Sequence, residues 1–147
     1  MTPRQVTDFL EELSAAFRKR DSRALLAQFS SRPEATYAGS EAEEIASGPE
    51  NIKTLFEDLF SRENAYSFAF GTPHVIVTPA GFWILAEGTG TEHGPFGDTE
   101  TFGYRVTGMI VIEGGRSVWL ALCGSEVVPP VVPIRRPLDE HNPGQLP

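Results

Sequence analysis

Acid–base chemistry is the chemistry that the side chains of this sequence could best supply, and Glu87 is the residue best placed for it. Glu87 alternates with Trp83, Leu85 and Thr89 in a strand-like stretch. If that face of the strand turns inward, an apolar surround raises the pKa of its carboxyl and suits it to act as a general base. The alternative is an exposed strand residue paired across the sheet with a cation such as Arg105.

Aromatic side chains could complete a binding site around such a carboxylate. Tyr37 and Tyr104 could each donate a hydrogen bond to a ligand, although large aromatics in a sheet also serve as core. The candidates for the apolar wall of a pocket are Phe17, Phe56, Phe60, Trp83 and Trp119. One carboxylate and one tyrosine at the end of an apolar cavity would suit a ligand with an aromatic or alicyclic body and one hydroxyl or carbonyl.

Nucleophilic and metal chemistry find less support. Cys123 is the single cysteine and has no recognisable histidine partner, so it is predicted to be a buried, inert thiol in the pocket wall near Trp119. The three histidines, His74, His93 and His141, lie far apart and show no metal-ligand spacing such as H-x-x-x-H. We therefore expect neither a metal nor another cofactor.

The charge and composition of the chain exclude several classes of partner. The 147 residues carry 12 basic and 20 acidic side chains, a net charge of −8 that repels a phosphate backbone. No apolar run reaches the roughly 20 residues of a membrane span, and acidic residues interrupt the first twenty positions where a secretory signal would need an apolar core. We expect a cytoplasmic protein that binds neither nucleic acid nor membrane.

Helical periodicity dominates the first 60 residues. The segment Thr2-Pro3-Arg4-Gln5 predicts a capped helix start. Asp21 is typical of the cap of a second, short helix, and a third helix is predicted to begin near Pro49. The apolar positions of the first and third helices repeat at helical spacing and are Val6, Phe9, Leu10, Leu13 and Phe17, then Ile52, Leu55, Phe56, Leu59 and Phe60.

A short strand is predicted at 35–38, before the third helix. Longer strands with period-two alternation are predicted after that helix, at 66–70, 74–78, 82–91, 101–113 and 116–124, with a hairpin turn at Gly114-Gly115. This order predicts an α+β fold, with helices first and a curved antiparallel sheet after them. We predict one domain over residues 1–128 and a Pro-rich extended tail over 129–147, whose Val131, Val132 and Ile134 are expected to pack against the body or a partner.

The last hairpin indicates that both faces of the sheet are covered. A turn at the two glycines puts Val106, Gly108 and Ile110 on one face with Trp119, Ala121 and Cys123. The opposite face then holds Met109 and Val111 with Val118, Leu120 and Leu122. Because both faces are apolar and the helices can cover only one, another copy of the chain is the simplest cover for the outer face. A homodimer is therefore expected.

Two stretches resemble the nuclear transport factor 2-like superfamily, and specifically its SnoaL-like branch. The first contains Ala35-Thr36-Tyr37-Ala38-Gly39, Glu43-Glu44 and Gly48-Pro49-Glu50-Asn51-Ile52, and is similar to the first strand, the Glu-containing hairpin and the start of the third helix of that family. The second contains Arg105-Val106-Thr107, Glu113-Gly114-Gly115 and the run from Trp119 to Ser125, and is similar to its last two strands. The resemblance spans roughly residues 6–128.

This resemblance implies a cystatin-like cone, in which about three N-terminal helices pack on a strongly curved mixed or antiparallel sheet. It also implies an apolar pocket at the open end and dimerisation through the outer sheet face. It implies no single activity, because the polyketide cyclase and ketosteroid isomerase-like fold serves isomerases, cyclases, hydrolases, dehydratases and oligomerisation modules.

The catalytic residues of the ketosteroid isomerases and SnoaL cyclases in this superfamily are replaced in this sequence. Leu13 or Phe17 stands at the tyrosine position, Gly39 at the base and Gly108 near the late acid, while Cys123 replaces the histidine of the terminal "H-x-S" pattern. Steroid-isomerase chemistry is therefore not expected.

Three functions from different classes stay open at this point. The leading hypothesis is a homodimeric domain that binds a small apolar or aromatic ligand in the cone pocket. The second is an isomerase, cyclase or hydratase with Glu87 as general base. The third is a structural or oligomerisation module whose own side chains fill the pocket. The volume of the pocket and the orientation of Glu87 distinguish them.

Overall fold

A computed structural model describes residues 1–130 of the chain, which form three helices and a sheet. Helix α1 (Pro3–Lys19) begins with the predicted capping box, in which Thr2 Oγ1 accepts from the Gln5 N–H at 3.2 Å and Gln5 Oε1 accepts from the Thr2 N–H at 2.7 Å. Helix α2 (Ser22–Ala27) is capped by Asp21, and helix α3 (Pro49–Ser61) follows Gly48. None of the helices in the described part is long and apolar enough to cross a membrane.

The seven strands form one open, mixed sheet. They are β1 (Thr36–Ala38), β2 (Ile45–Ser47), β3 (Ala65–Phe70), β4 (His74–Thr78), β5 (Gly81–His93), β6 (Thr99–Glu113) and β7 (Arg116–Val127). The strand order is β2-β1-β7-β6-β5-β3, and β4 also pairs with β5. Only the pairing of β1 with β7 is parallel. The predicted α+β cone, with three N-terminal helices on a curved sheet, is confirmed.

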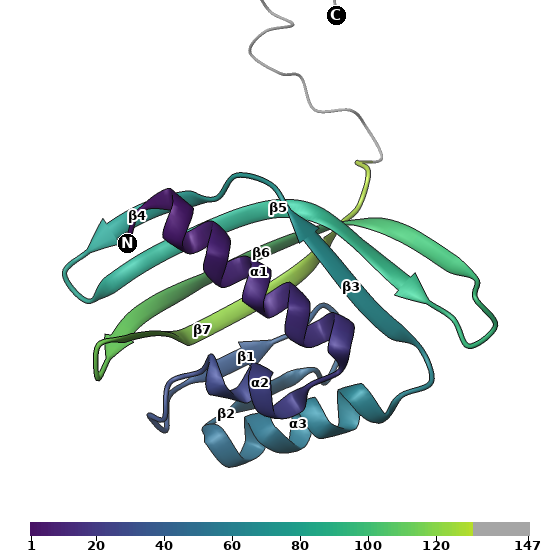
Figure 1. The fold of residues 1–147 in the computed structure, drawn as a ribbon, viewed down its shortest axis with the longest axis horizontal. Coiled ribbons are helices and arrows are strands. Elements are labelled where there is room, and N and C mark those ends of the chain that lie inside the picture. Colours follow the sequence, from purple (N-terminus) through teal and green to yellow (C-terminus); the bar gives the residue numbers. More distant parts are fainter. Residues whose placement is uncertain (131–147) are drawn as a thin grey trace, which may run out of the picture.

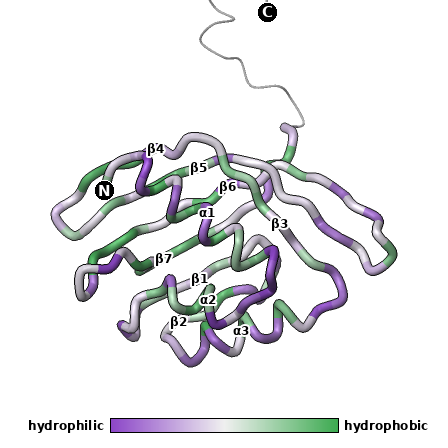
Figure 2. The backbone as a smooth tube through the Cα atoms, in the orientation of Figure 1, coloured by the Kyte–Doolittle hydropathy of each residue, from purple (hydrophilic) through white to green (hydrophobic). Residues whose placement is uncertain are grey.

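Helix α1 crosses one face of the sheet, while α2 and α3 lie together at the end that β1 and β2 form (Figure 1). The side chains between these layers form a single core, which takes Leu10 and Leu13 from α1, Ile84 from β5 and Val106 from β6. Figure 2 shows hydrophobic stretches along the central strands and hydrophilic ones on the outward sides of the helices. The face toward α1 is therefore the concave, inner face of the cone.

A β-bulge in the last hairpin changes which side chains face inward. Ile110 pairs with Trp119 as the glycine turn predicts, but Met109 pairs with Ala121, so Leu120 is an extra residue on β7. One extra residue reverses the alternation of every position beyond it. Leu122 consequently joins the core, and Cys123 moves to the outer face. The predicted facing of Ala121, Leu122 and Cys123 is wrong for this reason.

The tail predicted over residues 129–147 falls mostly outside the described residues. Val131, Val132 and Ile134 lie in that part, and their predicted packing stays a prediction.

Candidate functional site

A small cavity opens at the end of the cone between α1, the β1–β2 connection and strands β3, β6 and β7. Its volume is about 30 Å³, and an adjoining space of about 10 Å³ shares four of its wall side chains. Six lining residues are aromatic, namely Phe17, Tyr37, Tyr66, Phe68, Phe102 and Tyr104. The polar lining residues are Ser40, Glu41, Glu44 and Glu126. The cavity is thus an aromatic chamber with an acidic rim.

Glu44 is the most buried acidic residue of this cavity. It ends the turn between β1 and β2, where Glu43 has a left-handed φ of 69° and the Gly39 N–H donates to the Glu44 carbonyl at 2.7 Å. A β-carbon at position 39 would overlap a carboxyl oxygen of Glu44, so the absence of a side chain at Gly39 makes the space for this carboxyl. Glu44 is only 8% exposed.

The surroundings of Glu44 favour its protonated form. Burial, a hydrogen bond with Glu41 and the negative charge of Glu41 raise the pKa of the Glu44 carboxyl from 4.5 to about 7, although the positive charge of Arg62 opposes the shift. Arg62, which ends α3, pairs with Glu41 at 3.0 Å and with Asp58 at 3.5 Å. At neutral pH the carboxyl therefore exchanges its proton readily, as a general acid or base requires.

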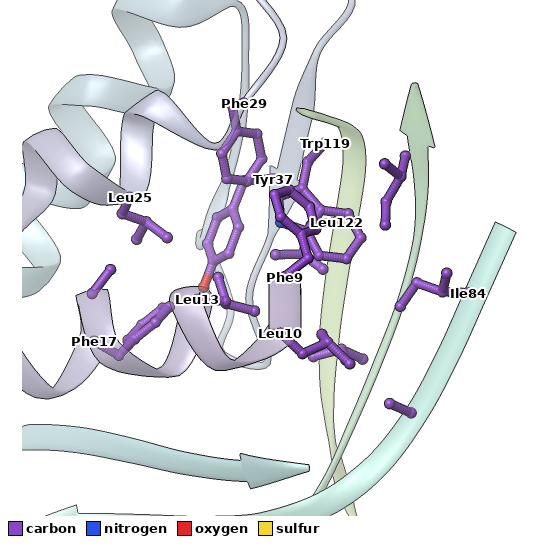
Figure 3. Close-up of a cluster of buried hydrophobic side chains, with 14 of the residues drawn as sticks. Phe9, Leu10, Leu13, Phe17, Leu25, Phe29, Tyr37, Ile84, Trp119 and Leu122 are labelled. Atoms are coloured by element: carbon purple, nitrogen blue, oxygen red, sulfur yellow. The ribbon is translucent and has the colours of Figure 1, made fainter. Parts of the chain in front are cut away.

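Two tyrosines stand beside this carboxyl. Tyr37 on β1 is buried, and desolvation, with Tyr104 and Glu44 nearby, holds the pKa of its hydroxyl well above the ordinary value. Desolvation also raises the pKa of Tyr104 on β6 to about 12, although a hydrogen bond with Ser40 acts the other way. Figure 3 shows the Tyr37 hydroxyl pointing toward α1, near Leu13 and Phe17. Both hydroxyls stay protonated at neutral pH and can donate hydrogen bonds.

Gly124 on β7 makes room for Tyr104 in the same way that Gly39 does for Glu44. A β-carbon at position 124 would overlap the Tyr104 hydroxyl. The polar end of the cavity therefore depends on two glycines, Gly39 directly after β1 and Gly124 within the neighbouring strand β7.

The sequence of the chain matches the model of the SnoaL-like domain over residues 6–120. The chain belongs to the SnoaL-like domain family. No curated protein matches it by sequence.

Solved structures share the fold of this SnoaL-like domain at low sequence identity. A candidate dehydratase of the NTF2-like family from Streptomyces avermitilis has a TM-score of 0.73 at 13% identity, over 85% of this chain and 96% of that one. An NTF2-like superfamily protein from Salmonella enterica has a TM-score of 0.72 at 14% identity, over 86% and 91% of the two chains. ActVI-ORFA from Streptomyces coelicolor has a TM-score of 0.69 at 14% identity, over 83% and 94%. These likenesses show an NTF2-like fold.

The fold of the SnoaL-like domain brings three of the predicted site residues to the cavity, namely Phe17, Tyr37 and Tyr104. Phe60 packs edge-on against Phe17, with ring centroids 5.4 Å apart, and so lies behind the wall. Phe56 and Trp119 are fully buried in the core away from the cavity. They contribute packing and do not line the site.

Glu87, Trp83 and Cys123 lie on the outer face of the sheet, contrary to the prediction. The inward positions of β5 are Ile84 and Ala86, so strand alternation turns Glu87 and Trp83 outward. The Glu87 side chain is 60% exposed and pairs with its cross-strand neighbour Arg105 at 3.4 Å. Glu87 therefore forms a surface ion pair, which is the alternative given for it in the sequence analysis. It does not line the cavity and cannot act there as a base.

Several cavity residues of the SnoaL-like domain were not identified from the sequence. Tyr66 and Phe68 on β3, and Phe102 on β6, alternate at the strand period, which is a signal that could have placed them on the same face as Tyr104. Glu41, Glu44 and Glu126 carried no such signal, because a turn and a strand end decide where they point. Within residues 1–130, no group of three or more potential ligand side chains could hold a metal ion.

Proposed function

We propose that this SnoaL-like domain binds a small ligand whose polar end enters the cone cavity and meets Glu44, Tyr37 and Tyr104. The observation that carries the proposal is the burial of an ionisable carboxyl and two hydroxyls in an aromatic chamber. Burying such groups costs stability unless they have partners, and a module that only fills its own core would gain more from apolar side chains there.

The volume of the cavity limits what can enter it. Space of about 30 Å³ takes a group of one or two heavy atoms. The aromatic or alicyclic body of the ligand would therefore rest at the mouth, against the half-buried rings of Tyr66 and Phe102. The small volume also supports a rival interpretation, in which the protein is a structural module whose own side chains fill the cone.

Gly124→Ala tests ligand binding, because its β-carbon must displace the hydroxyl of Tyr104, a residue that lines the cavity. We expect saturation-transfer NMR to detect phenol and 2-phenylethanol on the wild type and to lose most of that signal in Gly124→Ala. Ser125→Ala, a neighbouring change at an exposed position of β7, is the control and should bind as the wild type does. Equal signals in all three proteins, or none in any, would contradict binding in the cone.

A second candidate function is acid–base catalysis at the same site, and it is favoured by the Glu44 pKa of about 7. Glu44 would take a proton from carbon or donate one to a leaving hydroxyl, and Tyr37 or Tyr104 would donate a hydrogen bond to the oxygen that gains charge. The candidate dehydratase among the similar structures is consistent with such chemistry. Glu44→Gln would then abolish turnover while leaving the binding of neutral ligands intact.

We also propose that the protein acts as a homodimer through the outer face of the sheet. An apolar row crosses this face from β4 to β7, because Ile76 pairs with Trp83, Trp83 with Met109, and Met109 with Ala121. Ile76 is 56% exposed, and Trp83, Met109 and Ala121 are half-buried. A second copy of the chain carries the same apolar row, so two copies can pack these rows together around a two-fold axis. This self-complementarity supports a second copy, rather than an unrelated protein, as the partner.

Met109→Arg is expected to shift the dimer toward monomer or aggregate, because it places a charge in the middle of the apolar row. Sedimentation velocity at micromolar concentration measures the change. Thr54→Arg adds the same charge on the exposed surface of α3, away from the outer sheet face, and should leave the sedimentation coefficient unchanged. A wild-type chain that sediments as a monomer would remove the basis for the dimer.

A further inference from the structure

We propose that the ligand of the cone cavity is an organic cation, an amine with an apolar body whose ammonium group enters between the acidic rim and the aromatic walls. This inference rests on the proposed function and names the class of ligand that the same site selects.

The first support is the arrangement of the rings at the mouth. Tyr66 and Phe102 lie 6.5 Å apart between centroids at an interplanar angle of 73°, and Phe102 and Tyr104 lie 6.0 Å apart at 78°. Phe68 closes the inner side, 4.6 Å from Tyr104. Rings at near right angles present both faces and edges to the space between them. A cation is attracted to the faces, and amine-binding sites are built of such rings.

Strand β5 contributes to this chamber through Gly90, whose lack of a side chain leaves room for a neighbouring ring. Gly90 pairs with Phe68 on one side and with Phe102 on the other, so the three positions form one row across the sheet. A β-carbon at position 90 would overlap the Phe102 ring, which therefore lies directly over the glycine. The absence of a side chain at Gly90 therefore lets the Phe102 ring lie against the sheet, where it lines the cavity.

The second support is the sign of the charge around the cavity. Glu41, Glu44 and Glu126 line it from two different elements, and within the described residues no lysine or arginine lines it. Arg62 acts on Glu44 through its positive charge, but its guanidinium is already paired with Glu41 at 3.0 Å and with Asp58 at 3.5 Å. An ammonium group would find carboxylates on the rim, whereas a carboxylate ligand would meet like charge in a poorly solvated site.

The third support is the buried carboxyl itself. Glu44 is more than nine-tenths buried, lines the cavity and makes no ion pair within residues 1–130. A space of about 30 Å³ beside it accepts a group the size of an ammonium but not a ring. Size, charge and ring geometry thus point to the same head group.

A matched series of three probes tests the proposal by isothermal titration calorimetry at about pH 8, where the Glu44 carboxyl is mostly ionised. The probes are 2-phenylethylamine, 2-phenylethanol and phenylacetate, which share one ring and differ in the charge of the head group. We expect the amine to bind at least about tenfold more tightly than the alcohol, and the acid more weakly than both.

Two variants assign the preference to the site. Glu44→Gln should reduce the preference for the amine over the alcohol to about twofold or less. Phe102→Leu, which keeps an apolar side chain but removes the ring face, should weaken the amine severalfold more than the alcohol. Glu43→Gln, an exposed change in the same turn, is the control and should keep the full preference.

The outcomes separate this inference from the proposed function. Equal affinity for the amine and the alcohol, or an amine preference that survives Glu44→Gln, overturns the cation proposal and leaves ligand binding in place. Absence of binding for all three probes overturns the proposed function and the cation proposal with it.

Discussion

Glu44→Gln is expected to raise the melting temperature at about pH 8 and to raise it much less at about pH 5. The native state holds the Glu44 carboxyl at a pKa of about 7, whereas its ordinary value is 4.5. The native state therefore binds more protons than the unfolded state between these values, and its stability falls as the pH rises through about 7. Glutamine resembles the protonated carboxyl and does not ionise, so the variant escapes this loss.

The expected difference is about 2 kcal/mol in the free energy of unfolding at the higher pH, or roughly 5 °C in melting temperature. Differential scanning calorimetry of the wild type and the variant at both pH values measures it, and titrations common to both proteins cancel in the comparison. Glu43→Gln alters a neighbouring exposed residue and should show no pH-dependent difference. A Glu44→Gln effect of the same size at both pH values would mean that this carboxyl does not titrate near neutrality.

Such a result would bear directly on function. A carboxyl that lowers the stability of its own fold at neutral pH is not required by the fold, since a glutamine side chain of the same size would take its place in the turn. The stability gained by Glu44→Gln, together with the loss of amine preference in the same variant, would identify the carboxyl as a functional group.

Trp119→Ala is expected to have the largest effect on stability, a loss of about 3–5 kcal/mol in the free energy of unfolding. Trp119 is 0% exposed, and its ring lies 5.0 Å from that of Phe9 on α1. Figure 3 shows both side chains within the buried cluster. The same residue joins the segment after α2 to the sheet, because its N–H donates to the Gln28 carbonyl at 2.7 Å and its carbonyl accepts from the Ser30 N–H at 2.8 Å. Truncation therefore leaves a cavity between α1 and β7.

Urea denaturation followed by circular dichroism measures this loss, with two comparisons. Trp119→Phe should lose much less, because it keeps a ring and removes an indole N–H that has no hydrogen-bond partner in the described structure. Trp83→Ala removes the other tryptophan from the outer face, and should weaken the dimer more than it weakens the fold. Equal losses for Trp119→Ala and Trp83→Ala would contradict the assignment of Trp119 to the core and Trp83 to the interface.

The sequence by itself determined the three helices, the longer strands and their order, but not the short strand β2 (Ile45–Ser47). Each helix and each long strand was predicted from local signals: the capping box at Thr2, the period of apolar residues in α1 and α3, and the glycine turn before β7. The α+β class followed from that order. The motifs of two stretches, together with the order, carried the resemblance to the SnoaL-like family, and this resemblance implied the cone. Local signals suffice here because hydrogen bonding within a helix and the alternation of a strand depend on residues close in the chain.

The tertiary structure alone decided which side chains meet. A bulge at Leu120 exchanged Leu122 for Cys123 on the inner face, because one inserted residue reverses an alternation of period two. The facing of β5 turned Glu87 outward, since periodicity predicts two faces but not which one α1 covers. Glu44 lies in the cavity beside Gly39, which directly follows β1 and carries no side chain in the space that the carboxyl occupies. Such contacts join residues through turns and glycines, and no periodic pattern in the sequence records them.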